Sequence, residues 1–137
     1  MNSQLDRLEA SLFQLSDVIQ KHQEIVQKRF KVSSVEIDIL KLLDSEGDKK
    51  MKDIGERVRV KLSNLTNIID RLESQRLVKR VNSKEDRRSI LVTITKKGKR
   101  MLDEYNSQIR SLAEKISEIA QEDNLPTLVE TLEKATA

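Results

Sequence analysis

The sequence predicts a mostly α-helical protein that carries one small β-hairpin. Leucine, isoleucine and valine recur at intervals of three and four residues along most of the 137-residue chain, which is the spacing of a buried helix face. Only the segment from Leu77 to Thr95 contains β-prone runs, and within it Ile90, Val92 and Ile94 alternate with other residues, as in a half-buried strand. These observations indicate helices on both sides of a hairpin.

Charge is unevenly distributed along the chain, and this third observation suggests how the fold is used. Residues 1–48 carry 6 basic and 9 acidic side chains, residues 49–100 carry 17 and 6, and residues 101–137 carry 3 and 8. The three segments therefore have net charges of −3, +11 and −5. A basic middle between acidic ends is typical of a nucleic-acid-binding module attached to a separate scaffold.

The composition excludes several other classes of protein. The chain is long enough for one domain with a sizeable core. It has no cysteine, which excludes disulfides, cysteine metal sites and thiol redox sensing. No apolar run approaches membrane-spanning length, and the N-terminal residues MNSQLDRLEA lack signal-peptide character. We therefore expect a cytoplasmic protein with no membrane partner.

The first predicted helix covers residues 2–29 and has a heptad-like apolar seam. The members of the seam are Leu5, Leu8, Leu12, Leu15, Ile19, His22 and Val26. The seam can pack within one subunit or against a second copy. We favour a homodimer, because the C-terminal helices offer a matching partner and DNA readers are often two-fold symmetric. We expect a buried or interfacial imidazole at His22, and neither a metal nor a cofactor, since the chain has no second histidine and no cysteine.

Three short helices are predicted in the middle of the chain. Ser33 and Glu36 form a capping-box sequence that begins the first of them, and Gly47 is a natural residue to end it. The second covers residues 51–58 and tolerates Gly55 if another helix crosses closely there. The third follows after a brief turn, so that the three together form a helix-turn-helix.

The third of these helices, KLSNLTNIIDRLE at residues 61–73, has two distinct faces. The apolar arc consists of Leu62, Leu65, Ile68, Ile69 and Leu72. The opposite arc begins with short side chains that are poor helix formers but can donate and accept hydrogen bonds: Ser63, Asn64, Thr66 and Asn67. Ser63 can cap the helix, whereas the other three suit base edges, with asparagine pairing with adenine and threonine with several bases. The alternative is a solvated polar face that binds nothing.

The hairpin that follows has a polar, charged tip from Asn82 to Arg88. Asp86 and Arg88 are two residues apart, so in an extended segment they point the same way and the carboxylate can hold the guanidinium in one pose. An oriented arginine on a protruding hairpin suits the narrow, negative minor groove of DNA. The alternative is an ordinary hairpin with charges at its tip, but helix and hairpin together form a specific signal.

Helix and hairpin together resemble the winged helix-turn-helix of the MarR family of bacterial transcription regulators. The resemblance lies in KLSNLTNIIDRLE, then LVKR, then SKEDRRSILVTIT followed by KKG, and it is clearest over about residues 32–105. The family's Asp-x-Arg wing signature falls on Asp86 and Arg88. The family usually has glycine where this chain has Arg76, which suggests an altered turn. It often has a small residue where Lys61 stands, which adds a phosphate contact.

After the wing, Thr95 can cap a helix that runs to about Ala120. Four basic residues crowd the start of this helix against its dipole, which indicates a nearby phosphate or a hinge: Lys96, Lys97, Lys99 and Arg100. Asn124 and Pro126 are expected to break it before a last short helix. Residues 1–30 and 101–137 would form the dimerisation region and residues 31–100 the DNA-binding region of one continuous fold.

The resulting prediction is a homodimeric, sequence-specific DNA-binding transcription regulator, with one 61–73 helix in each of two major grooves of a near-palindromic operator. Arg88, held by Asp86, would enter the minor groove, and Arg87 would lie on the backbone. Asp70 and Glu73 facing phosphates would contradict this docking. Base edges would be contacted by Ser63, Asn64, Thr66 and Asn67, and phosphates or flanking bases by Lys61, Arg71 and Lys84.

The resemblance to the MarR family also implies a repressor that a small-molecule effector releases from DNA. Since only 2% of the residues are aromatic, a regulator without a ligand or with an apolar ligand fits better than one that binds a phenolic ring. A protein-interaction or architectural DNA-binding module would explain the acidic helices but not the polar arc. An enzyme is disfavoured, because one histidine, no cysteine and three scattered glycines leave no nucleophile–base pair or phosphate loop.

Overall fold

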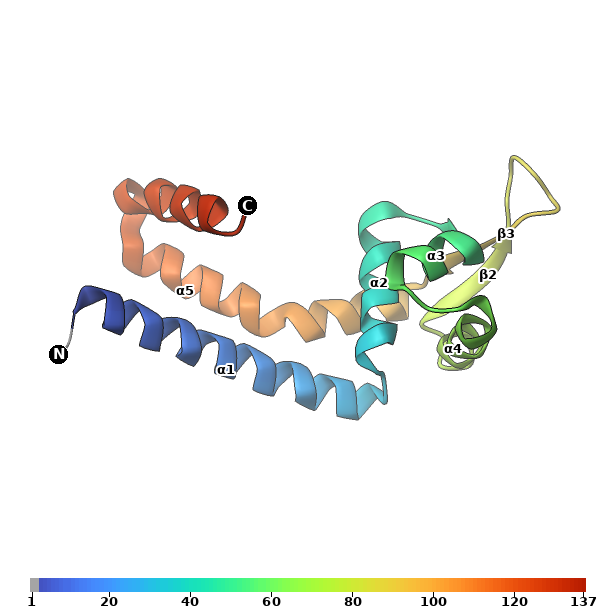
Figure 1. The fold of residues 1–137 in the computed structure, drawn as a ribbon, viewed down its shortest axis with the longest axis horizontal. Coiled ribbons are helices and arrows are strands. Elements are labelled where there is room, and N and C mark those ends of the chain that lie inside the picture. The colour runs from blue at the N-terminus through green and yellow to red at the C-terminus, as the bar shows by residue number, and fades with distance from the viewer. Residues whose placement is uncertain (1–2) are drawn as a thin grey trace. The chain divides into compact units, whose positions relative to one another are not determined.

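The computed structural model describes residues 3–137, and most of them are helical (Figure 1). The elements in chain order are α1 (Gln4–Phe30), α2 (Ser34–Glu46), β1 (Lys49–Lys50), α3 (Met51–Val58), α4 (Leu62–Ser74), β2 (Val78–Asn82), β3 (Ile90–Ile94) and α5 (Lys96–Ala135). The predicted fold class, helices around one small hairpin, is confirmed. No helix within residues 3–137 is both long enough and apolar enough to cross a membrane.

The chain forms two compact units. One contains the residues up to Ile19 together with Asn106–Ala137, and the other contains Gln20–Tyr105. The Gln20–Tyr105 unit has the buried core, to which every element from α1 to the start of α5 contributes except the two-residue strand β1. Its fully buried side chains include Val26, Ile37, Ile39, Leu40, Leu43, Ile54, Leu65, Ile69, Leu72, Leu77, Val92 and Met101.

Helix α2 begins and ends as its sequence predicts. The Glu36 N–H donates to the Ser33 hydroxyl at 3.2 Å, and the Ser33 N–H donates to the Glu36 carboxylate at 3.1 Å, which completes the capping box. Gly47 ends the helix with φ 85°, a conformation that L side chains rarely adopt. Helix α3 also has its predicted bounds, residues 51–58.

Gly55 lies in α3 where the following turn returns to the helix. The Val60 N–H donates to the Gly55 carbonyl at 3.0 Å, and a Cβ at Gly55 would lie 2.9 Å from the Val60 carbonyl oxygen and 3.5 Å from Leu65 of α4. The close approach expected at Gly55 is therefore present, but the nearest atom belongs to the turn rather than to the crossing helix.

Helix α4 begins two residues earlier than a cap at Ser63 would place it. Lys61 is the N-cap residue and makes no side-chain capping bond. Ser63 is the second residue of the helix, so the prediction that it caps α4 is wrong. The remaining short polar residues of the first turn are therefore not explained by capping either.

The three strands form an antiparallel sheet in the order β1-β3-β2. Arg80 of β2 lies opposite Val92 of β3, and the buried Val92 and Val78 face the core. Between β2 and β3 the chain forms a loop over residues 83–89 that extends beyond the ends of the strands (Figure 1). This loop is the tip of the wing.

Arg76 lies in the turn between α4 and β2 with φ 63°. This is the left-handed region that glycine occupies without steric cost and that an L side chain enters at a cost of about 1 kcal/mol or more. The altered turn expected from an arginine at this position is therefore not found, because Arg76 adopts the conformation that suits glycine.

Helix α5 is interrupted at Gln121, whose φ and ψ of 62° and 166° are not helical. The expected end near Ala120 is confirmed, but the break is not at Asn124 or Pro126, which lie inside the helical segment that follows. Figure 1 shows this last segment, drawn in red, folding back beside the segment that precedes it.

Gly98, in the first turn of α5, packs against the base of the wing. A Cβ at this position would lie 2.3 Å from the Leu77 carbonyl oxygen and 2.7 Å from Cγ1 of Ile94. The Leu77 carbonyl cannot move away freely, because it accepts the Thr95 N–H at 3.0 Å. Glycine is therefore required here by close packing.

We expect Gly98→Ala to lower the free energy of unfolding by about 2 kcal/mol, since overpacking outweighs the gain of about 1 kcal/mol in helix propensity. Urea unfolding followed by circular dichroism measures this change. Lys99→Ala, at the exposed next residue, is the control and should leave stability within about 0.5 kcal/mol of the parent. A Gly98→Ala protein as stable as the parent would contradict the packing described.

Candidate nucleic-acid interface

Helix α4 separates a buried face from an exposed polar face. Leu65, Ile69 and Leu72 are completely buried, whereas four polar side chains of the first turns are exposed: Ser63, Asn64, Thr66 and Asn67. Within residues 3–137, no side-chain hydrogen bond forms at Ser63, Asn64 or Asn67, and the Thr66 hydroxyl donates to the Leu62 carbonyl at 3.0 Å. Three of the four groups are thus available to an external partner as both donors and acceptors.

Leu62 does not belong to the buried arc in which its spacing places it. Its side chain is 59% exposed, although Leu65, one turn later, is completely buried. Leu62 is the first residue of α4 and has no turn of helix before it to cover its side chain. It lies instead on the exposed surface, next to Lys61 and Ser63.

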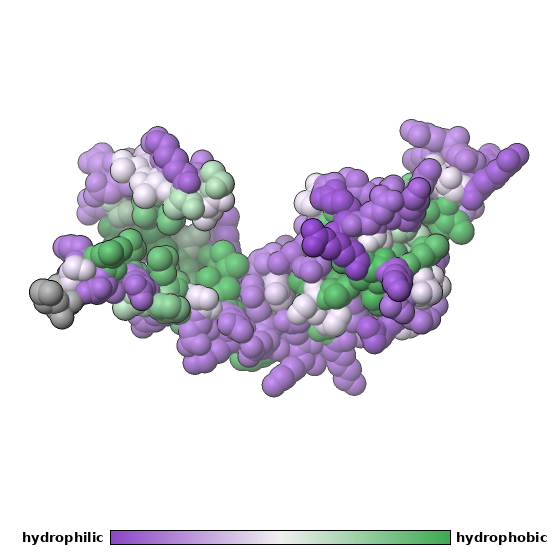
Figure 2. Space-filling view, in the orientation of Figure 1, coloured by the Kyte–Doolittle hydropathy of each residue, from purple (hydrophilic) through white to green (hydrophobic). Residues whose placement is uncertain are grey.

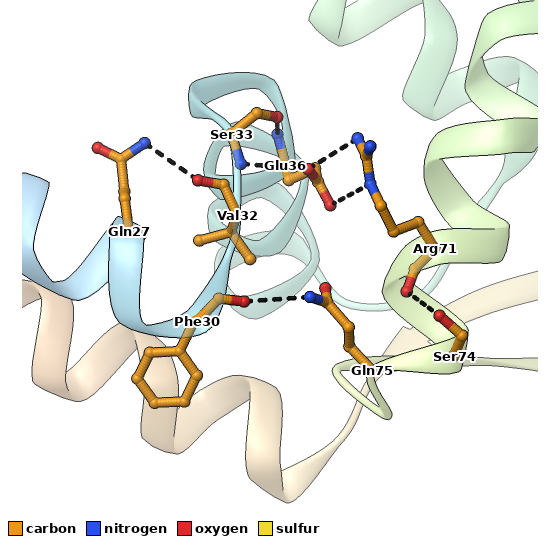
Figure 3. A network of polar contacts seen from close by, with 8 residues as sticks. All are labelled: Gln27, Phe30, Val32, Ser33, Glu36, Arg71, Ser74 and Gln75. Carbon is orange, nitrogen blue, oxygen red and sulfur yellow. Dashed lines mark hydrogen bonds and ion pairs between the residues drawn. The ribbon is translucent and has the colours of Figure 1, made fainter.

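A network of polar contacts holds α4 against α2 (Figure 3). Nη2 of Arg71 donates to Oε1 of Glu36 at 2.9 Å, and Nε donates to Oε2 at 3.4 Å. The Glu36 side chain, which is 1% exposed, also completes the capping box of α2. At the C-cap of α4, Nε2 of Gln75 donates to the Phe30 carbonyl at the end of α1 at 3.1 Å.

This network was not predicted, and it gives Arg71 a role within the protein. Its guanidinium was expected to contact phosphates or flanking bases. In the structure its Nε and Nη2 atoms bond to Glu36, while the side chain is 56% exposed. A buried carboxylate must be paired to be tolerated, so the geometry indicates that Arg71 positions α4. The capping-box sequence explained Glu36 fully, and nothing in the spacing of Glu36 and Arg71 identified them as partners.

A second set of ion pairs joins the C-terminal half of α4 to the wing. The Arg80 guanidinium donates to Asp70 at 2.8 Å and to Glu73 at 2.7 Å, and the Arg80 N–H donates to the other oxygen of Glu73 at 3.1 Å. Burial alone would lower the pKa of Arg80, but the two carboxylates raise it above its usual value. The single positive charge of Arg80 therefore balances one of the two negative charges that would repel DNA phosphates at this end of α4.

The tip of the wing is shaped by Asp86, although not in the way its spacing from Arg88 suggested. The Asp86 carboxylate accepts the backbone N–H of Arg88 at 3.0 Å and the Ser89 hydroxyl at 3.3 Å. The Ser89 N–H donates to the Asp86 carbonyl at 2.9 Å. These bonds close a turn with Arg87 and Arg88 at its centre.

The expectation that Asp86 holds the guanidinium of Arg88 is therefore wrong. The carboxylate bonds to the backbone of the turn, and no ion pair within residues 3–137 involves Arg87 or Arg88. Both arginines and Lys84 are exposed. Asp86 thus fixes the backbone of the two arginines, while their guanidinium groups can bind a partner.

The base of the wing is closed by Thr95. Its hydroxyl accepts the Gly98 N–H at 3.0 Å, which confirms Thr95 as the cap of α5, and donates to the Arg76 carbonyl at 2.6 Å. Nζ of Lys97 donates to the Gln75 carbonyl at 3.0 Å. Among the four basic residues at the start of α5, Lys97 therefore has a partner at the C-terminal end of α4, where the helix dipole favours a cation.

His22 is half-buried, and its Nε2–H donates to the backbone carbonyl of Glu104 at 2.8 Å. In the same region Arg29 forms an ion pair with the Glu104 side chain. Residues 3–137 contain no cluster of three or more histidine, cysteine, aspartate or glutamate side chains that could hold a metal ion.

Comparison with known proteins gives a consistent assignment. The sequence profile of the MarR family matches residues 32–90, which span α2 to the start of β3. The uncharacterised HTH-type transcriptional regulator YpoP of Bacillus subtilis is 32% identical over 111 residues, which cover 81% of this chain and 77% of YpoP. The chain belongs to the MarR family of transcriptional regulators.

Other members match over shorter stretches. YfiV of Bacillus subtilis, also an uncharacterised HTH-type transcriptional regulator, is 41% identical over 70 residues. These residues cover 51% of this chain but only 44% of YfiV, so the chain spans less than half the length of that relative.

Solved structures confirm the MarR-type winged helix fold. A MarR-like transcriptional regulator from Thermotoga maritima has a TM-score of 0.72 and 28% identity, over 99% of this chain and 96% of its own. A mutant of S. aureus MepR bound to an oligodeoxyribonucleotide has a TM-score of 0.65 over 93% of this chain and 95% of its own. The MepR protein is only 16% identical and supports the fold alone.

We expect Arg71→Ala to lower the free energy of unfolding by about 2–3 kcal/mol, because it leaves the buried Glu36 carboxylate with the Ser33 N–H as its remaining partner. Chemical denaturation measures this change. Arg110→Ala, which removes an exposed ion pair with Glu114 on α5, should cost less than about 0.5 kcal/mol. Equal effects of the two substitutions would contradict the role given to Arg71.

Proposed function

We propose that this MarR-family chain is a homodimeric, sequence-specific DNA-binding repressor. The observation that carries the proposal is the surface formed by α4 and the wing tip. Ser63, Asn64 and Asn67 expose hydrogen-bonding groups that make no bond within residues 3–137, and Arg87 and Arg88 are exposed at the centre of the wing turn. A solvated face needs no such concentration of poor helix formers.

The roles of the residues follow from the chemistry of the two grooves. Helix α4 enters the major groove, where Asn64 and Asn67 pair with adenine edges and Ser63 and Thr66 contact neighbouring bases. Thr66 can only accept from a base while its proton is donated to the Leu62 carbonyl. Lys61 and Lys84 bind phosphates, which position the protein on the duplex.

The wing completes the contact in the adjacent minor groove. Arg88 enters this groove, whose negative potential attracts a guanidinium, and Arg87 lies on the sugar–phosphate backbone. Asp86 contributes by holding the turn. Arg71 and Arg80 contribute by holding α4 in place: Arg71 joins it to α2, and Arg80 joins it to β2.

Dimerisation is supported by the apolar surface of the unit that contains the N-terminal part of α1 and most of α5. Figure 2 shows apolar side chains gathered over these two segments. On α1, Leu5, Leu8, Leu12 and Phe13 are 51–70% exposed. On α5, Ile109, Ile119, Val129 and Leu132 are 43–81% exposed. Contiguous exposed apolar surface of this kind marks an interface, and a two-fold dimer would present two α4 helices to one duplex.

Repression and control by a small molecule complete the proposal. MdtR of Bacillus subtilis, which is named as a transcriptional repressor, is 36% identical over 67 residues that cover 49% of this chain and 43% of MdtR. A MepR-like protein whose structure was solved with pseudoligands is 27% identical, with a TM-score of 0.56. A reporter gene behind the operator tests both: the protein should lower expression, and an effector among screened metabolites should restore it.

Selection of bound sequences from random DNA tests DNA recognition directly and should return a near-palindrome with half-sites about one helical turn apart.

On the selected site we expect Arg88→Ala to weaken binding at least tenfold and Asp86→Ala to weaken it less, because the latter disorders the turn but keeps both arginines. Gel-shift titration measures the affinities. Arg110→Ala, an exposed residue of α5, is the control. Unchanged affinity in both wing variants would contradict the wing contact, and no enriched sequence would contradict the function.

We expect Leu8→Glu combined with Leu12→Glu to convert the protein from a dimer of roughly twice 15.8 kDa to a monomer, because four charges would be buried in the assembled interface. Light scattering coupled to gel filtration measures the mass. Gln14→Glu, at an exposed position of the same helix, should leave the dimer intact. A parent protein that is already monomeric at micromolar concentration would contradict the proposed assembly.

A further inference from the structure

The start of α4 carries an apolar surface that hydrogen-bond readout does not use. Leu62 is 59% exposed, although it is the first residue of the helix that carries the polar arc. An exposed leucine by itself needs no explanation. Leu62, however, lies between Lys61, assigned above to a phosphate, and Ser63, assigned above to a base. In the proposed complex its side chain would therefore lie at the DNA surface.

Leu62 is also part of a hollow of about 370 Å³ at the turn between α3 and α4. Met51, Gly55, Val60 and Leu62 contribute to its lining, which is mainly apolar. The hollow is also lined by Lys52, Arg59 and Lys61, with Glu56 as its one acidic residue. An apolar surface among three cations matches a ligand that combines apolar groups with phosphates, and that description fits one strand of DNA.

Thr66, one turn after Leu62, adds a second apolar element. Its hydroxyl donates to the Leu62 carbonyl at 3.0 Å, so in this rotamer it cannot donate to a base. The hydroxyl oxygen can still accept from a base, and the methyl group of threonine suits the 5-methyl group of thymine. Residues four apart on a helix lie on the same face, so Leu62 and Thr66 together form one apolar strip beside the asparagines.

We propose that Leu62, supported by Thr66, reads a thymine in each half-site through the 5-methyl group that this base exposes in the major groove. The inference rests on the proposed function and adds a specificity-determining contact to it. Among the four bases only thymine presents a methyl group in that groove. Because residues at the N-terminal end of a reading helix contact base edges, Leu62 is placed to make this contact, and the cations around the hollow hold the adjoining phosphates.

Deoxyuridine provides the decisive probe, since it differs from thymidine only by lacking the 5-methyl group and keeps the same hydrogen-bonding edges. The experiment replaces the thymines of the selected operator one position at a time, symmetrically in both half-sites. Gel-shift titrations then compare the parent protein, Leu62→Ala and the conservative variant Leu62→Met. Ile90→Ala, which shortens a 49% exposed apolar side chain of the wing, is the matched control.

For the parent protein we expect deoxyuridine at one symmetric position to weaken binding about fourfold per half-site, the value of one buried methyl group. Leu62→Ala should bind the thymine operator more weakly by a similar factor and should no longer distinguish the two operators. Leu62→Met and Ile90→Ala should both keep the discrimination. Because Leu62 is largely exposed, Leu62→Ala should unfold at the same urea concentration as the parent, which separates a lost contact from a damaged fold.

Two results would overturn the inference while leaving the proposed function intact. The first is a parent protein that binds with equal affinity whichever thymine is replaced. The second is a Leu62→Ala protein that discriminates thymine from deoxyuridine as well as the parent does. A failure of the proposed function would look different, because random DNA would then yield no preferred sequence for any of these proteins.

Discussion

The position of α4 depends on one carboxylate that is buried between two helices. Glu36 accepts the Ser33 N–H and so begins α2, and it accepts two N–H groups of Arg71 and so holds α4. A buried charge tolerates few arrangements, since each lost partner leaves it unpaired in a poorly solvating environment. If α4 slid along α2, the pair would break. The start of one helix and the placement of the next are therefore fixed by the same side chain.

A second ionic clamp acts at the other side of α4. Arg80 joins Asp70 and Glu73 to strand β2, and Thr95 and Lys97 join the following turn to the start of α5. Helix and wing are thereby connected by several directional bonds, which is how a recognition surface is held to the accuracy that base readout demands. Of the two negative charges that Asp70 and Glu73 bring to these bonds, Arg80 balances one.

The sequence was sufficient for those features that depend on neighbouring residues. The capping box at Ser33, the end of α2 at Gly47, the bounds of α3 and the cap at Thr95 all follow from local chemistry, and all are found. The Glu36–Arg71 pair could not be predicted in this way, because its partners are 35 residues apart. The capping box already accounted for Glu36, and Arg71 was assigned to DNA. Leu62 was misplaced because helical spacing ignores that a first residue has no preceding turn to cover it.

The wing shows a further limit of reasoning from spacing. Two residues that are two apart point the same way only if the segment is extended, and the segment around Asp86 is a turn. The asparagine and proline near the end of α5 are ordinary helix breakers, yet the break occurs at Gln121. Neither residue type nor spacing determines which of several neighbouring positions adopts the unfavourable backbone.

The left-handed turns after α1, α3 and α4 share an unusual feature. Each is occupied by a basic residue, Lys31 with φ 56°, Arg59 with φ 58° and Arg76 with φ 63°. The conformation costs an L side chain about 1 kcal/mol or more, of which a cation near the end of a helix recovers about 0.3–1 kcal/mol. Glycine at any of these turns would remove the cost of the left-handed conformation. It would also remove a positive charge and so weaken the long-range attraction to a polyanion. Thermal stability and capture of a charged target are thus opposed at the same three positions of the backbone.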